Sequence, residues 1–135
     1  MEKELQTKIT EILQNHDVCG FINIGAPSIE YQPEARIITK AIFCYNGNSY
    51  LEEVIYLTFL HLLHWEVSKQ TQQHIKSDID HFIKINPHIE KEIAKNPLSI
   101  KSAQAIIDKI FEDDFIDLAS KLIEEYEELL KELHY

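Results

Sequence analysis

Glycine, proline and cysteine are scarce in this 135-residue chain, which has three, four and two of them. An all-β protein needs many tight turns, and tight turns depend on glycine and proline, so this scarcity argues against an all-β fold. Cys19 and Cys44 are too few for a disulfide framework, and they do not have the spacing of a zinc site. We therefore expect two reduced, buried thiols and a cytoplasmic protein.

Positive charge is also scarce. The chain has 13 Lys and Arg against 23 Asp and Glu, a net charge of −10, and Arg36 is the single arginine. A general nucleic-acid binder needs a basic stripe, so direct binding of nucleic acid is not expected. The charged N-terminal residues do not have the pattern of a secretory signal. The central uncharged run, Val54–Trp65, is shorter than the roughly 20 residues of a membrane span, so no membrane association is expected.

Apolar residues make up 44% of the chain and recur mainly at helical spacing. This pattern predicts an all-α fold, a single domain over residues 1–135 built as a bundle of about six to seven helices. An ordered loop rich in glycine and proline is expected at 17–33. The predicted helices are 2–15, one from Pro33 to a stop at Asn46, 50–67, 70–85, a short one after Pro87, 99–112 and 114–133.

Residues 50–67 are apolar on nearly every side, which predicts a central helix enclosed by the others. Ser49 with Glu52 three residues later has the pattern of a capping box, in which each side chain binds a free amide at the start of a helix. The third helix is therefore expected to begin at Ser49, with Leu60 and Leu63 in the core around it.

The last helix has its own predicted cap and inner face. Asp114 and Asp117 are expected to cap it, because a carboxylate at a helix start accepts hydrogen bonds from free amides. The predicted inner face consists of Phe115, Leu118, Ala119, Leu122, Tyr126, Leu129 and Leu130.

His74, Asp78 and His81 have a spacing that places them on one face of the fourth helix. Imidazole and carboxylate are ligands that zinc or iron accepts, which makes these residues a weak metal candidate. Polar residues at helical spacing are also typical of any solvated helix face, and no second helix offers the matching Glu-x-x-His pair of a di-iron bundle. The prediction is no metal and no other cofactor.

No motif of nucleophilic, nucleotide-dependent or zinc-dependent catalysis is found in the sequence. The chain is therefore predicted not to be an enzyme. Negative charge, by contrast, is concentrated at the C-terminal end, since residues 112–135 hold nine acids and two bases, or 2 − 9 = −7. Such a face is either simply solvated or a binding surface whose field attracts a basic partner. The candidate partner-binding residues are Asp114, Asp117, Glu124, Glu125 and Glu128, with Glu30 and Glu34 as a second patch.

The segment Gly25–Glu34, GAPSIEYQPE, resembles the G-A-P-x-D-E-Y-D-x-E motif of the YugE-like family of small bacterial helical proteins. Upstream, Asp17–Phe21 resembles the D-P-x-G-[LI] of that family. The likeness covers about half of the chain, and Val18-Cys19 and Gln32 depart from it. The resemblance implies a helical interaction protein, since the function of the family is unknown.

A small, acidic, cysteine-poor helical chain of this kind also resembles the immunity proteins of bacterial toxin systems, including those of contact-dependent growth inhibition. That resemblance implies a cytoplasmic protein that binds and neutralises one cognate toxin, typically a basic nuclease. Three interpretations stay open: an immunity protein, a YugE-like interaction protein, and a metal-binding helical protein. A homodimer is compatible with each of them.

Overall fold

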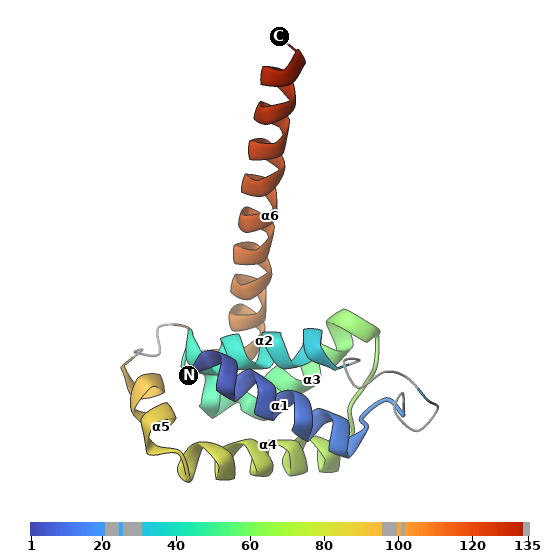
Figure 1. Ribbon diagram of the computed structural model, residues 1–135. Coiled ribbons are helices and arrows are strands. Elements are labelled where there is room, and N and C mark those ends of the chain that lie inside the picture. The colour runs from blue at the N-terminus through green and yellow to red at the C-terminus, as the bar shows by residue number, and fades with distance from the viewer. Residues whose placement is uncertain (21–24, 26–30, 96–99, 101, 134–135) are drawn as a thin grey trace.

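A computed structural model describes residues 1–20, 25, 31–95, 100 and 102–133. Over these residues the regular secondary structure is helical throughout, which confirms the predicted all-α fold. The elements are α1 (Glu2–His16), α2 (Gln32–Phe43), the short 3₁₀ helix η1 (Gly47–Tyr50), α3 (Leu51–Leu63), α4 (Lys69–Lys84), α5 (Pro87–Ala94) and α6 (Ala103–Leu133). The helices α1 to α5 and the first part of α6 form one body, from which the rest of α6 stands clear (Figure 1).

The core of this body is made mainly of isoleucine and leucine. α1 packs against α2 and α4, while α3 packs against α2, α4 and α6. Each helix contributes side chains at the three- and four-residue spacing that places them on one face. Fully buried examples from the five helices are Leu5, Ile9, Leu13, Ile38, Ile42, Ile55, Phe59, Ile75, Ile79, Ile106 and Ile110. The short helix α5 packs against α4 and α2 and adds Ile89 and Ile93 to the core.

Several helix ends follow the predicted local chemistry. The Asn86-Pro87 step separates α4 from α5, with Pro87 in the first turn of α5, where its missing N–H is not needed. The Asn86 side chain donates to the Phe82 carbonyl at 2.8 Å and so satisfies a free acceptor at the end of α4. Asp17 ends α1, as predicted, in the left-handed conformation that often closes a helix.

Most of the predicted loop 17–33 lies outside the described residues. The described ends of this segment are joined by Tyr31, whose ring is fully buried. Its hydroxyl donates to Asp17 Oδ1 at 2.7 Å and accepts the Cys19 amide at 3.0 Å. Burial, with the carboxylates of Glu34 and Asp17 adding to it, raises the pKa of the Cys19 thiol to about 11.

The predicted capping box at Ser49 is wrong. Ser49 is exposed and belongs to η1, and α3 begins after Tyr50 with no side-chain hydrogen bond at its start. α3 also ends at Leu63, earlier than predicted, because His64 takes the left-handed conformation and the chain then continues to α4 without regular secondary structure. Leu60 and Leu63 are consequently only half-buried. Cys44 was expected to be buried as well, but it is exposed at the end of α2.

The predicted boundary between a sixth and a seventh helix is also wrong, because 103–133 is one continuous helix. The segment 112–114 contains neither proline nor glycine, so nothing in it interrupts the helical hydrogen bonds. Ser102 is the residue that caps this helix, since its hydroxyl accepts the Ala105 amide at 3.1 Å.

Candidate binding surface

The apolar side chains of α6 lie on two different faces of the helix, one buried and one exposed. In the first part of the helix, Ala103, Ile106, Ile107 and Ile110 are buried against the body. From residue 115 onward the apolar side chains lie on another side of the helix, roughly 150° away at 100° per residue. That second apolar face meets no other element of the described body, and the projecting part of the helix leaves it open to solvent (Figure 1).

The predicted inner face of the last helix is therefore not buried in the single chain. Phe115 is 71% exposed and Tyr126 63% exposed, and the leucines of this face are exposed as well. Of the predicted set only Ala119 is half-buried. Helical periodicity located the apolar face correctly. The prediction that this face is buried was wrong, because this part of the helix projects beyond the body.

Acidic residues anchor α6 where it leaves the body. Asp114 forms an ion pair with Arg36 of α2, and Asp113 accepts a hydrogen bond from the hydroxyl of Tyr45. That hydrogen bond, together with Lys109 one turn earlier, lowers the pKa of the Asp113 carboxyl. The two carboxylates point about 100° apart around the helix axis and bind two separate residues of the body, and so they fix the direction in which α6 projects.

These contacts change the roles predicted for two acidic residues. Asp114 was predicted both to cap a helix and to bind a partner, but its carboxylate already pairs with Arg36. Glu34 was predicted to belong to a second partner-binding patch and is only 2% exposed, so it cannot reach a partner protein. Glu30 lies outside the described residues. Sequence reasoning did not identify Arg36 and Tyr45 as the residues that hold the helix, because no local pattern relates them to residues 113 and 114.

The other predicted acids form one exposed surface on the projecting part of α6. Asp117, Glu124 and Glu128 are exposed and lie on the side of the helix opposite its exposed apolar face. Glu125 is exposed at the flank of this stripe. None of these four carboxylates takes part in an ion pair within the described residues. We call Asp117, Glu124, Glu125 and Glu128 the acidic stripe.

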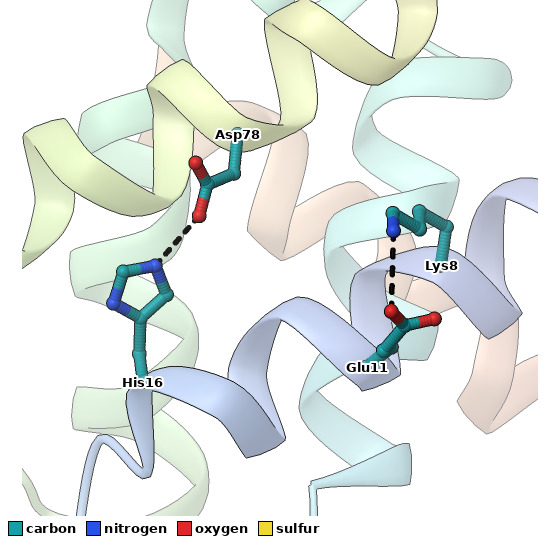
Figure 2. Close-up of polar contacts among 4 residues, drawn as sticks. All are labelled: Lys8, Glu11, His16 and Asp78. Carbon is teal, nitrogen blue, oxygen red and sulfur yellow. Dashed lines mark hydrogen bonds and ion pairs between the residues drawn. The ribbon is translucent and has the colours of Figure 1, made fainter.

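The weak metal candidate has a different arrangement from the one expected. Asp78 of α4 pairs with His16 at the end of α1, with 2.8 Å between Oδ2 and Nε2 (Figure 2). His74 lies near the same histidine, with ring centroids 6.4 Å apart. Within the part of the chain that the structure describes, no three His, Cys, Asp or Glu side chains converge closely enough to hold a metal. The Asp78 carboxylate instead joins α4 to α1, and Lys8 and Glu11 form a local pair on α1 at 3.2 Å (Figure 2).

No described helix combines the length and the apolar character needed to cross a membrane. Known protein families, curated proteins and solved structures were all compared with this chain, and none matches it. The resemblances to the YugE-like family and to immunity proteins thus stay predictions from the sequence.

Proposed function

We propose that this chain is a non-enzymatic binding protein that neutralises a cationic protein, most specifically as the immunity protein of a basic nuclease toxin. The observation that carries the proposal is the acidic stripe. It presents carboxylates on a helix that stands clear of the body, and these carboxylates have no ion-pair partner within the described residues.

The chemistry of such binding is charge complementarity without any bond made or broken by this chain. A nuclease must hold a polyanion, so its cleft is lined with Lys and Arg. Carboxylates on a helix can occupy that cleft in place of phosphates. Because the helix is anchored at its root by Asp113 and Asp114, little conformational freedom is lost on binding. The field of the stripe also accelerates encounter with a positive surface.

The proposal is tested by reversing two charges of the stripe. The protein encoded immediately upstream of this chain is the first partner to purify, because toxin and immunity genes would be expected to lie together. We expect Glu124→Lys/Glu128→Lys to slow association and to weaken inhibition of the nuclease activity of that protein. Binding of the wild-type chain should slow as salt is raised, since exposed charges are screened beyond about 8–10 Å at physiological ionic strength.

A matched control reverses two exposed acids that lie on other helices. Glu53→Lys/Glu90→Lys changes the net charge by the same amount but leaves α6 intact, and both side chains are exposed. If the two double variants bind with equal kinetics, only net charge matters and the stripe has no role. An upstream protein with neither nuclease activity nor affinity for this chain would refute the immunity interpretation.

A further inference from the structure

The apolar face of α6 needs an explanation separate from that of the acidic stripe. Phe115 and Tyr126 alone expose roughly 270 Å², taking about 200 Å² for each aromatic side chain. Seven aliphatic residues of the same face are also exposed, from Ile116 to Leu133. The two aromatic and seven aliphatic side chains together form a continuous patch that exceeds the few hundred Å² that a monomer usually leaves uncovered. A patch of this extent marks an interface.

The spacing of this face has the seven-residue repeat of a helix that pairs with another helix. Two of its columns repeat every seven residues from one end of the projecting part to the other. They contain Phe115, Leu122 and Leu129, and Ala119, Tyr126 and Leu133. Together they form an alternating three- and four-residue seam about 27 Å long, at 1.5 Å per residue. The repeat does not extend back into the buried part of α6, where the apolar residues lie on the other side.

We propose that the occupant of this face is α6 of a second copy of the chain, running antiparallel to the first. In one antiparallel register every layer of the seam is filled by apolar residues. Phe115 meets Leu133 of the other copy, and Ala119, the smallest side chain of the seam, meets Leu129. Leu122 meets Tyr126 at the centre. Large residues thus oppose smaller ones or fill the ends, which is the packing that interdigitating helices require.

A third column favours the antiparallel direction over the parallel one. Ile116, Ile123 and Leu130 also repeat every seven residues, on one flank of the seam. In an antiparallel pair the same flanks of the two helices meet, so Ile123 lies beside its own copy and Ile116 lies beside Leu130. In a parallel pair each flank meets the opposite one, whose column is Leu118, Glu125 and Glu132. Ile123 would then lie beside Leu118, but Leu130 would lie beside Glu125.

The charges of the helix are compatible with this pairing. Asp117, Glu124 and Glu128 point away from the seam, so the acidic stripe of each copy stays exposed in the dimer. Glu125 is the acid that would lie beside its own copy, at the flank opposite Ile123. Since that contact and the two negative helices repel each other, we expect the dimer to tighten as salt is raised. A basic partner on the same face would show the reverse salt dependence.

The oligomeric state of the full chain is the first test, measured by sedimentation equilibrium at micromolar concentration. We expect a dimer, and we expect Leu122→Glu to raise its dissociation constant about 100-fold or more, because each dimer loses two buried leucines. Leu122 is already 56% exposed in the single chain, so its replacement should leave the helical circular dichroism of the body unchanged. Ser120→Glu adds the same charge on the polar side of the helix and should leave the dimer intact. A monomer, or an assembly of more than two copies, would overturn the proposal.

Cross-linking then tests the direction of pairing, in a chain with Cys19 and Cys44 replaced by alanine. Ile123→Cys should cross-link to its own copy with a short bismaleimide. Ala119→Cys should not, because the two copies of residue 119 would be about ten residues, or roughly 15 Å, apart along the seam. In a parallel pair residue 119 faces itself, so efficient cross-linking through Ala119→Cys and not through Ile123→Cys would refute the antiparallel arrangement. None of these results depends on what the acidic stripe binds.

Discussion

Replacement of Gly47 by alanine is expected to destabilise the protein, although nothing about the backbone of this residue requires glycine. Gly47 is buried in η1, at the point where η1 passes between α2 and α6. A Cβ at this position would lie 2.8 Å from the carbonyl oxygen of Ala41 and 3.3 Å from Cδ1 of Ile106. The first contact is closer than real Cβ atoms tolerate and involves backbone, which cannot rotate away.

The expected size of the effect follows from two opposing contributions. Forcing an extra methyl into a packed site costs about 1–3 kcal/mol. Alanine also restricts the unfolded chain more than glycine does, which stabilises the folded state by about 0.4–1 kcal/mol. We therefore expect Gly47→Ala to lower the free energy of unfolding by about 1–2 kcal/mol. Urea titration followed by circular dichroism should then show the midpoint lowered by roughly 0.5–1 M, for a slope of about 2 kcal/mol per M.

A second variant separates the two contacts. Ile106→Val shortens the side chain that lies 3.3 Å away, but it leaves the Ala41 carbonyl in place. Added to Gly47→Ala, it should therefore give no rescue and should cost a further 0.5–1.5 kcal/mol or so for the lost methylene. An unchanged midpoint for Gly47→Ala would refute the close approach of η1 to α2. Rescue by Ile106→Val would show that the side chain, rather than the backbone, is the constraint.

Three further predictions concern local contacts. Tyr31→Phe should lower the free energy of unfolding, measured by urea titration, by about 2 kcal/mol, because it removes a hydrogen bond to the Asp17 carboxylate and one from the Cys19 amide. An unchanged midpoint would mean that water replaces both hydrogen bonds. Burial raises the pKa of the Cys19 thiol to about 11, so this thiol should react slowly with iodoacetamide at pH 8 and reach half of its maximal rate only near pH 11. Fast alkylation at pH 8 would contradict this prediction. Ser68→Ala should lower the free energy of unfolding by about 1 kcal/mol because Ser68 caps α4, whereas Ser49→Ala should change it by less than about 0.5 kcal/mol. A larger effect of Ser49→Ala than of Ser68→Ala would support the capping box at Ser49.

The sequence by itself determined the fold class and most of the helices. Apolar residues at three- and four-residue spacing, such as Ile75 and Ile79 in α4, bury one face of a helix wherever that helix lies, so periodicity is sufficient to find it. Breaks such as Asn86-Pro87 are equally local, because proline cannot continue the hydrogen bonds of the preceding helix. The apolar face of residues 115–133 was also found correctly from its spacing.

Only the tertiary structure decided what each face meets. Asp114 and Asp117 were predicted to cap a new helix. Arg36, 78 residues earlier in the chain, binds Asp114 instead, Tyr45 binds the neighbouring Asp113, and α6 continues through both positions. Glu34 looked like an exposed acid in the first turn of a helix, yet the packing of α2 buries it. Periodicity gives the direction in which a side chain points relative to its own helix axis, whereas burial depends on which other helix occupies that direction. No element of the described body packs against the apolar face in the second half of α6. This is why a face that the sequence predicted as core is exposed in the single chain.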